Sequence, residues 1–378
     1  MKMRNYILIL LTSLLLVACG GVQPSKTLSG LQRENFVTEI DGKMTDLYVL
    51  NNANGVEVCF TNHGARIVSV MVPDRDGILR DVVLGFDSIA GYVNLATDFG
   101  ATVGRYANRI DHGRISLDGE VYQLPCNNYG HCLHGGPNGF QTRVFDVESV
   151  TDTTIVMTYL AADGEEGFPG NVLCRVAYTL THDNAIDIQY SATTDKTTIV
   201  NLANHAYFNL DGDASKSNAD YLFYINASGY TPVDSTLMTT GDILAVEGTP
   251  MDFRTPTAVG ARINDTAEQL RYGMGYDHNW VLDTQGDMSQ VAARLTSPAT
   301  GIVLEVYTDQ PGLQVYSGNF LNGTVIGKGN VPCNHRSAMV LETQKFPNSP
   351  NYPHWPSPVL RAGETYKAAC VYKFSVEE

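Results

Sequence analysis

Alternation of apolar and polar residues with a period of two is the feature that most constrains how this chain of 378 residues folds. In residues 174–180 and 185–190 every second side chain is apolar, and the polar residues 182–184 between them are typical of a hairpin turn. The same pattern recurs in residues 56–60, 154–160, 302–307, 313–316 and 368–374, and residues 67–72 form a more continuous apolar run. Gly, Asn and Asp separate these segments at turn spacing. Many strands of this kind predict packed antiparallel sheets.

Helical patterns are scarce. Residues 257–272 carry the best one, and residues 87–92 are long enough for a single turn. No strong internal repeat appears, and no linker inside the body is rich enough in Pro or Ser to divide it. The sequence therefore predicts one large all-β domain, an antiparallel β-sandwich with few short helices.

The N-terminus has the organisation of an export signal. Lys2 and Arg4 precede an apolar run over residues 6–17, which is short for a membrane span. The run ends Leu-Val-Ala-Cys at residues 16–19, which resembles the bacterial lipobox and implies that Cys19 is lipidated and begins the mature chain. An ordinary secretory signal and a misread start codon are the alternatives.

This interpretation divides the chain into three parts. Residues 1–18 are expected to be the lipoprotein signal peptide, and residues 19–30, rich in Gly, Ser, Pro and Gln, a flexible tether. Residues 31–378 are expected to form the folded domain. The protein would then be exported and lipid-anchored, facing the periplasm or the cell surface, with the lipid as its only attachment to the membrane.

The charge of the chain excludes one class of partner. Its net charge is −15, and removal of Lys2 and Arg4 with the signal would lower it to −17. Such a surface repels phosphate backbones, so we expect no nucleic-acid partner, and it argues mildly against phosphorylated substrates. Apart from Cys19 there are six cysteines, and because no spacing between them demands a disulfide or a metal, we expect buried free thiols.

Two residues could carry acid–base chemistry. Glu342 closes the apolar run 338–341, and the Pro- and Asn-rich residues after it cannot continue a sheet. A carboxylate at the end of a rigid strand, in front of an irregular loop, is a typical position for a general base. His205 lies where the apolar residues 198–202 give way to polar turn residues, and imidazole titrates near neutral pH. Alone, either residue could be a solvated or hydrogen-bonded side chain of the fold.

Several other polar groups could bind a ligand rich in hydroxyl groups. Two basic side chains and an amide occur together in residues 104–110, where Arg109 and Asn108 could form a fork onto vicinal hydroxyls. His134 precedes two glycines, which let a ligand approach the backbone closely. Asp277 is followed by the aromatic residue Trp280, and Gln310 lies in a turn.

Other chemistries lack support in the sequence. His131 and His134 are three residues apart, but no carboxylate or cysteine stands at a recognised ligand spacing, so we expect no metal site. There is neither a phosphate-binding glycine loop nor a GxSxG nucleophile motif. The candidates together indicate a hydroxyl-binding pocket with one base and one acid.

Seven segments, in this order along the chain, resemble the aldose 1-epimerase (galactose mutarotase) family, and the resemblance covers the body from Phe36 onward. The segments are residues 104–110, 133–136, 164–170, 204–210, 276–280, 309–312 and 341–351. The resemblance implies a large antiparallel β-sandwich that interconverts the α and β anomers of free aldoses. It also implies a monomer or a loose homodimer that requires no metal, nucleotide or redox cofactor.

The resemblance also implies roles for individual residues. Glu342 matches the catalytic base of the family and His205 its catalytic acid, and His134 matches a residue that hydrogen-bonds the sugar near the reacting centre. The positions that match hydroxyl-binding residues are Asn108, Arg109, Asp277 and Gln310, together with Arg105. An ionised base and a protonated acid acting together predict a bell-shaped dependence of rate on pH.

Three competing functions stay open at this point. A non-catalytic sugar-binding module would not need Glu342 and His205 together. A glycoside hydrolase needs two carboxylates across the scissile bond, and Asp277 with Glu342 could supply them. An epimerase for a phosphorylated sugar would need an additional basic cluster, which this acidic chain does not show.

Overall fold

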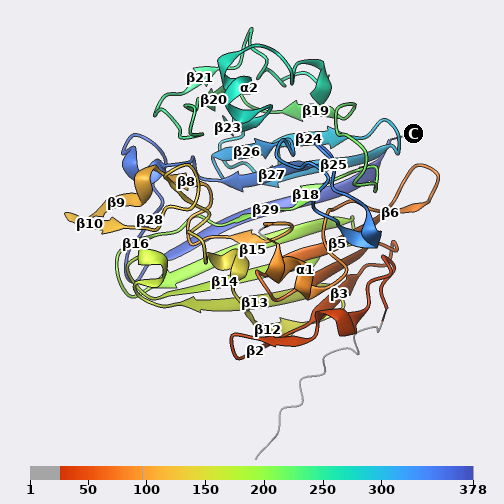
Figure 1. Ribbon diagram of the computed structural model, residues 1–378, viewed down its shortest axis with the longest axis horizontal. Coiled ribbons are helices and arrows are strands. Elements are labelled where there is room, and N and C mark those ends of the chain that lie inside the picture. Colours follow the sequence, from red (N-terminus) through yellow and green to blue (C-terminus); the bar gives the residue numbers. More distant parts are fainter. Residues whose placement is uncertain (1–25, 96, 378) are drawn as a thin grey trace, which may run out of the picture.

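The fold is all-β, as the sequence predicts. The computed structural model describes residues 26–95 and 97–377, so the predicted signal peptide and the predicted lipidation site at Cys19 lie outside the described residues. Antiparallel sheets are the main regular structure of the described chain, and its two α-helices are short, α1 (Ile89–Asn94) and α2 (Glu268–Gly273) (Figure 1).

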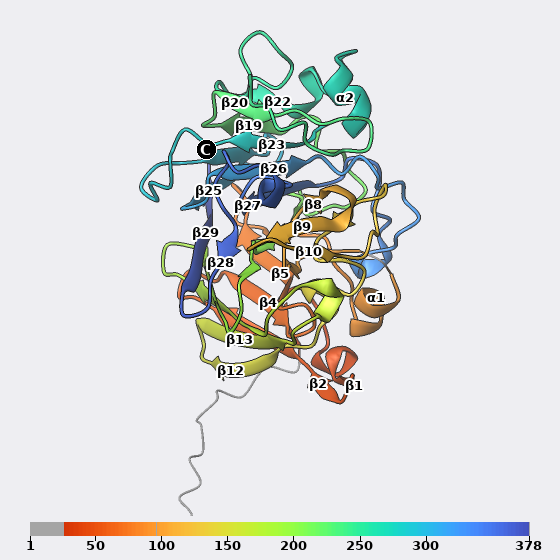
Figure 2. The same ribbon diagram turned by 90° about the vertical axis from the view of Figure 1, so that its left-hand side faces the viewer.

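A nine-stranded antiparallel sheet is the largest element. In spatial order its strands are β12 (Asp146–Val150), β13 (Thr154–Ala161), β14 (Val172–Leu180), β15 (Ala185–Thr194), β29 (Thr365–Val376), β25 (Ile302–Thr308), β24 (Ala293–Thr296), β19 (Leu222–Ile225) and β22 (Thr257–Ala258). The expected hairpin turn joins β14 to β15. Figure 2 shows β12 and β13 at one end of the molecule and β20, β22 and α2 at the other.

A six-stranded antiparallel sheet carries Asp277 and Glu342. Its spatial order is β18 (Tyr207–Phe208), β27 (Met339–Gln344), β26 (Gly312–Tyr316), β23 (Asp277–Val281), β20 (Gly229–Thr231) and β21 (Leu244–Ala245). A four-stranded antiparallel sheet consists, in spatial order, of β3 (Leu47–Asn51), β4 (Glu57–Thr61), β5 (Arg66–Pro73) and β6 (Leu79–Asp81).

Short two-stranded pairs and single turns of 3₁₀-helix complete the described chain. The pairs are β1 (Thr38–Ile40) with β2 (Lys43–Thr45), β9 (Arg114–Leu117) with β10 (Glu120–Gln123), β8 (Arg109–Ile110) with β11 (Cys132–Leu133), β16 (Thr198–Ile199) with β28 (Val359–Leu360), and β7 (Thr102–Val103) with β17 (Ala203–Asn204). The 3₁₀ turns are η1 (Arg33–Phe36), η2 (Asp111–Gly113), η3 (Phe140–Thr142), η4 (Glu165–Gly167), η5 (Val259–Ala261), η6 (Lys328–Asn330) and η7 (Ser349–Asn351).

The main hydrophobic core lies between the nine-stranded sheet and the strands that cover it. Along β14 buried residues alternate with more exposed ones, which is the period of two seen in the sequence. Every residue of β27, in contrast, is buried. Met339 and Leu341 belong to the main core, and the Tyr372 hydroxyl of β29 donates to the Leu341 carbonyl over 2.8 Å. Because side chains alternate, Glu342 lies on the opposite face of β27 from these core residues.

The structure corrects three details of the sequence prediction. Glu342 lies inside β27, which continues to Gln344, and not at the end of the strand. The helix predicted for residues 257–272 is wrong, because Val259 and Gly260 donate their N–H groups to carbonyls near β19, and only the 3₁₀ turn η5 and the start of α2 are helical. The described end of the expected tether is ordered, since the Leu28 N–H donates to the Glu57 carboxylate over 2.6 Å.

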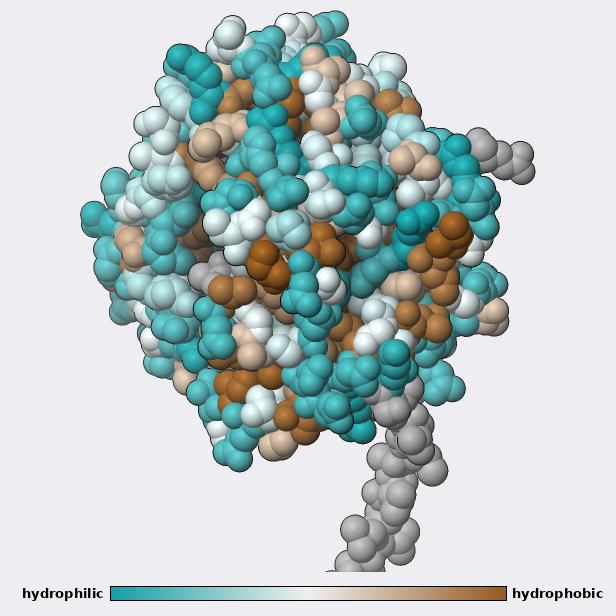
Figure 3. Space-filling view, turned by 45° about the vertical axis from the view of Figure 1, so that its right-hand side comes forward, coloured by the Kyte–Doolittle hydropathy of each residue, from teal (hydrophilic) through white to brown (hydrophobic). Residues whose placement is uncertain are grey.

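The six cysteines beyond Cys19 are free thiols in the structure. Five are buried and Cys126 is exposed. No helix in residues 26–95 and 97–377 is long and apolar enough to cross a membrane. On the face shown in Figure 3, hydrophobic residues form scattered patches among hydrophilic ones.

A buried arginine holds together three loops near the site. Arg66 is 1% exposed, and its guanidinium donates to the carbonyls of His63, Phe99 and Gln141 at 3.1, 2.9 and 2.5 Å. Gly100 follows one of these carbonyls, and its N–H donates to the His205 carbonyl over 3.0 Å. The loop of Gly100 is therefore tied both to β5 and to the chain that carries His205.

Substitution Gly100→Ala tests this close packing. Gly100 has a φ of +69°, and a Cβ atom there would lie 1.8 Å from the Ile67 carbonyl oxygen. We expect the free energy of unfolding to fall by about 2–5 kcal/mol, from the left-handed backbone together with the overpacking. Urea denaturation followed by tryptophan fluorescence measures the loss.

Gly119→Ala is the matched control, because Gly119 has a φ of +88° but no atom within 4 Å of the added Cβ. It should lose only the backbone contribution, about 1–2 kcal/mol. Equal losses in the two variants would contradict the close packing of Gly100 against β5.

Candidate active site

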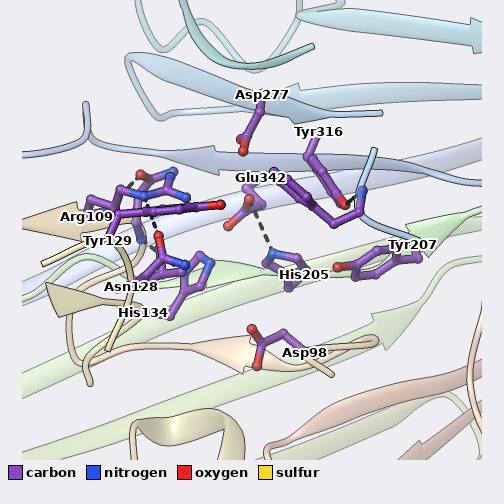
Figure 4. Close-up of a pocket in the computed structure, with 13 residues that line it drawn as sticks. Asp98, Arg109, Asn128, Tyr129, His134, His205, Tyr207, Asp277, Tyr316 and Glu342 are labelled. Carbon is purple, nitrogen blue, oxygen red and sulfur yellow. Dashed lines mark hydrogen bonds and ion pairs between the residues drawn. The ribbon is translucent and has the colours of Figure 1, made fainter. Parts of the chain in front are cut away.

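A cavity of about 330 Å³ brings together six of the eight predicted site residues (Figure 4). The strands β8, β18, β23, β26 and β27 and the loops beside them line it. The lining residues are Asp98, Asn108, Arg109, Asn128, Tyr129, Leu133, His134, His205, Tyr207, Asp277, Tyr316, Phe320 and Glu342.

Glu342 is a buried carboxylate on the cavity side of β27. It is 2% exposed, and its Oε2 atom has no hydrogen-bond partner. Its Oε1 atom lies 3.6 Å from Nε2 of His205 (Figure 4). Burial raises the pKa of Glu342 from its usual value near 4.5 to about 7, although His205 opposes this rise. A carboxylate of this kind is a base that can exchange protons near neutral pH.

The two histidines of the cavity have different environments. His205 lies between β17 and β18, with Nε2 toward Glu342 and with a buried Nδ1 that has no partner. Nδ1 of His134 accepts the Asn108 N–H over 3.1 Å, so the proton of a neutral His134 is on Nε2. Burial lowers the pKa of His134 well below its usual value, and His205 and Arg109 lower it further. His134 is therefore a neutral donor, and His205 is the imidazole that faces the base.

A second wall of the cavity carries groups that suit hydroxyl binding. The Gln314 side chain donates to Oδ1 of Asp277 over 2.7 Å, and Nε of Arg109 donates to Oδ1 of Asn128 over 3.0 Å. Burial raises the pKa of Asp277, while the Arg109 guanidinium and the Gln314 amide oppose the rise. Carboxylate, guanidinium and amide groups on one wall can together donate to and accept from neighbouring hydroxyls.

Aromatic rings make the remaining surface of the cavity. Tyr316 and Phe320 are stacked, with ring centroids 5.9 Å apart, and Tyr129 is largely exposed. Trp280, the aromatic residue singled out in the sequence, does not line the cavity. It is buried in the main core, where its indole N–H donates to the Met251 carbonyl over 3.0 Å.

Two predicted binding residues lie outside the cavity. Gln310 is in the turn between β25 and β26, and its side chain donates to Asp309 over 2.7 Å. Arg105 donates to the carbonyls of Pro169 and Gly170 at 2.8 and 3.0 Å, and its guanidinium lies over the Phe168 ring. Arg105 therefore holds the loop of residues 164–170, and the structure gives it a positioning role in the fold.

Sequence reasoning missed Gln314, whose side chain donates to Asp277, and named Gln310, which lies outside the cavity lining. The missed signal is the alternation within β26. Leu313 and Val315 face the core, so Gln314 and Tyr316 must share the other face. Gln314 pairs in register with Glu342 of the neighbouring strand, which places it on the cavity face. Asp98 was also missed, because it lies in a loop and no periodic pattern marks it.

Two clusters of side chains could surround a bound atom. In the first cluster, one side-chain N or O atom of each of Asp98, His134 and His205 lies within 4.8 Å of those of the other two. The second cluster of the described residues, formed by Asp111, His112 and His131, has the same spacing. His131 thus lies in a different cluster from His134. Ligand atoms around a tetrahedral zinc are roughly 3.3 Å apart, since the bonds are about 2.0 to 2.1 Å long. A spacing of up to 4.8 Å also suits an oxygen atom hydrogen-bonded to all three residues of the first cluster.

A second cavity of about 480 Å³ lies near η6, but its charged groups already have partners. Lys328 donates to Asp81 over 2.6 Å, and Arg80 forms an ion pair with Asp74 at 2.8 Å. Neither a histidine nor a glutamate lines it. The chemistry that the sequence indicates therefore belongs to the first cavity.

Comparison with known proteins gives one consistent result. The sequence model of the aldose 1-epimerase family matches residues 46–373. The chain is 42% identical to the galactose mutarotase of Mus musculus over 313 residues, which are 83% of this chain and 89% of that protein. It is 39% identical to the aldose 1-epimerase of Escherichia coli over 339 residues, 89% of this chain and 97% of that protein.

Solved structures agree with the sequence relatives. The crystal structure of an aldose epimerase homologue from C. elegans superposes with a TM-score of 0.82 at 31% identity, covering 88% of this chain and all of that one. The structure of a galactose 1-epimerase from Lactobacillus acidophilus gives a TM-score of 0.80 at 29% identity, covering 90% and 97%.

The raised pKa of Glu342 can be measured directly. Infrared difference spectra between the protein and its Glu342→Gln variant isolate the carboxyl band of this residue. Because burial favours the neutral carboxyl group, we expect the band to disappear as the pH rises through about 7, and not through 4.5. Disappearance between pH 4 and 5 would contradict the strong desolvation of Glu342.

Proposed function

The chain belongs to the aldose 1-epimerase family, and we propose that Glu342 is the base and His205 the acid of its reaction. The protein is an isomerase that interconverts the α and β anomers of free aldoses. The observation that supports the two roles is the approach of Nε2 of His205 to within 3.6 Å of the Glu342 carboxylate, inside a cavity lined by hydroxyl-binding groups.

In this proposal each of the two residues transfers one proton when the ring opens and one when it closes. Glu342 removes the proton from the C1 hydroxyl, and protonated His205 delivers a proton to the ring oxygen as the bond from C1 to that oxygen breaks. The open-chain aldehyde then rotates about its C1–C2 bond and presents the other face of the carbonyl. The ring closes with the roles of the two residues reversed, so no proton is gained or lost overall.

The other residues of the cavity hold the sugar in place. His134, neutral and protonated on Nε2, donates a hydrogen bond near the reacting centre. Asp277, Arg109 and Asn108 bind the remaining hydroxyls, and the Gln314 amide fixes the Asp277 carboxylate. Glucose and galactose are the proposed substrates, because the sequence relatives include proteins named galactose mutarotase.

The competing functions fit the site less well. A hydrolase needs a second carboxylate across the bond, and an imidazole, not a second carboxylate, is the group that faces Glu342 here. A phosphorylated sugar would meet three carboxylates, those of Asp98, Asp277 and Glu342, against the single guanidinium of Arg109 among the lining residues. A neutral sugar avoids this repulsion.

We also propose that the enzyme is exported and lipid-anchored through Cys19, as a monomer or loose homodimer. The support is the order of charge, apolar run and lipobox-like residues at the N-terminus. In that position the enzyme would equilibrate the anomers of sugars outside the inner membrane before their uptake.

Polarimetry on freshly dissolved α-glucose and α-galactose tests the catalytic roles. The purified protein should accelerate the decay of optical rotation above the rate in buffer. We expect Glu342→Gln and His205→Asn each to lower kcat by about 10²–10⁴-fold, because each removes one partner of the proton transfers.

Glu39→Gln, an exposed substitution on β1, is the control and should keep full activity. Decay equal to buffer on both sugars with the unaltered protein would overturn the proposed function. Full activity of Glu342→Gln would overturn the assignment of the base alone.

Cell fractionation tests the anchor. Cys19→Ser removes the thiol that the lipid would modify, so the protein should move from the membrane fraction to a soluble fraction, since burial of acyl chains supplies the membrane affinity. An unaltered protein that is soluble in lysates without detergent would rule the anchor out.

A further inference from the structure

Asp98 is a carboxylate in the cavity for which the acid–base mechanism has no use. It is a lining residue of the cavity, in the loop between α1 and β7, and it is partly exposed. Within residues 26–95 and 97–377 its carboxylate accepts no hydrogen bond and forms no ion pair. Its backbone is nevertheless fixed, because the Ala101 N–H donates to the Asp98 carbonyl over 3.0 Å. An ordered carboxylate without a partner, inside a binding cavity, is free to accept hydrogen bonds from a ligand.

The position of Asp98 relative to the proposed acid is specific. A carboxylate oxygen of Asp98 lies within 4.8 Å of a ring nitrogen of His134 and within 4.8 Å of a ring nitrogen of His205. Figure 4 shows His205 between Glu342 on one side and Asp98 on the other. Nδ1 of His205 is buried and has no hydrogen-bond partner. A polar atom of the substrate between these groups would therefore meet at least one donor and one acceptor.

The proposed chemistry fixes how a sugar lies along these residues. Its C1 hydroxyl is at Glu342 and its ring oxygen at His205. The ring oxygen has two carbon neighbours, C1 and C5, and since C1 is directed toward Glu342, C5 extends to the opposite side of His205. That side is where Asp98 lies. In a hexose, C5 carries the hydroxymethyl group, so its 6-hydroxyl reaches the vicinity of the Asp98 carboxylate.

We propose that Asp98 accepts a hydrogen bond from the 6-hydroxyl of the sugar and so makes the enzyme selective for neutral hexoses. The inference rests on the proposed function, because the direction of the sugar follows from the roles of Glu342 and His205. A hydrogen bond to a charged acceptor is stronger than one between neutral groups. Sugars without this hydroxyl leave the carboxylate unpaired, and sugars with a phosphate or carboxylate at C6 are repelled by it.

A cycle of two proteins and two substrates tests the contact. The mutarotation of α-glucose and of α-6-deoxyglucose is measured by polarimetry with the unaltered protein and with Asp98→Ala. We expect the unaltered protein to prefer glucose by about tenfold or more in kcat/KM, and Asp98→Ala to reduce this preference to near one. The loss should appear on glucose alone, because 6-deoxyglucose has no hydroxyl for Asp98 to bind.

The pattern of results separates the contact from other roles of Asp98. Equal losses on both sugars would show that Asp98 acts through His205 or the loop, and would overturn the proposal. An unchanged preference for glucose in Asp98→Ala would overturn it as well. If the unaltered protein accelerates neither sugar, nor galactose, the proposed function fails and not only this contact.

Two further measurements define the contact. Asp98→Asn keeps an acceptor oxygen without the charge, so it should retain part of the preference for glucose. It should also improve the low activity expected on glucuronate, because one repelling carboxylate is removed. Asp76→Ala, an exposed substitution outside the cavity lining, is the matched control and should leave the preference for glucose over 6-deoxyglucose unchanged.

Discussion

Burial of one carboxylate is the constraint on which the rest of the site depends. A glutamate in water is a weak base at neutral pH, because it gives up its proton near pH 4.5. Glu342 lies on a strand whose two faces are both covered, and the loss of water raises its pKa to about 7. The nine-stranded sheet supports β27 from its opposite face, and the hydrogen bond from Tyr372 to the Leu341 carbonyl fixes the strand at that point. The large core thus contributes to the chemistry by fixing the position of the strand that carries Glu342.

In the same buried environment, the neighbouring residues His134 and His205 have different roles. Both are buried to the same extent, and their rings meet edge to face at 5.0 Å. A backbone N–H occupies Nδ1 of His134 and holds it as a neutral donor, whereas His205 faces an ionisable carboxylate. Burial lowers the pKa of His134 well below its usual value, and the hydrogen bond at its Nδ1 leaves only Nε2 to donate. Composition alone cannot reveal this difference, because it depends on which ring atom meets which neighbour.

Patterns of local origin were predictable, and contacts between distant segments were not. The period of two identified the sheets, and the polar residues beside strands identified Glu342, His205, His134 and Asp277. The boundary of β27 was missed, because the partner strand that extends it to Gln344 is far away in sequence. Gln314 was missed, although the alternation within β26 already places it on the polar face. Residues 257–272 have helical spacing, but pairing with β19 determines their start.

The arginines that position the loops around the cavity contact the main chain. Arg66 donates to three carbonyls and Arg105 to two at short distance, and neither forms an ion pair with an acidic side chain of the described residues. A carbonyl is present whatever the residue that carries it. The loops can therefore change their side chains during evolution while they keep their places beside the cavity. Stability and substrate choice are in this way separable, and new specificities can arise on the rim without loss of the acid and the base beneath it.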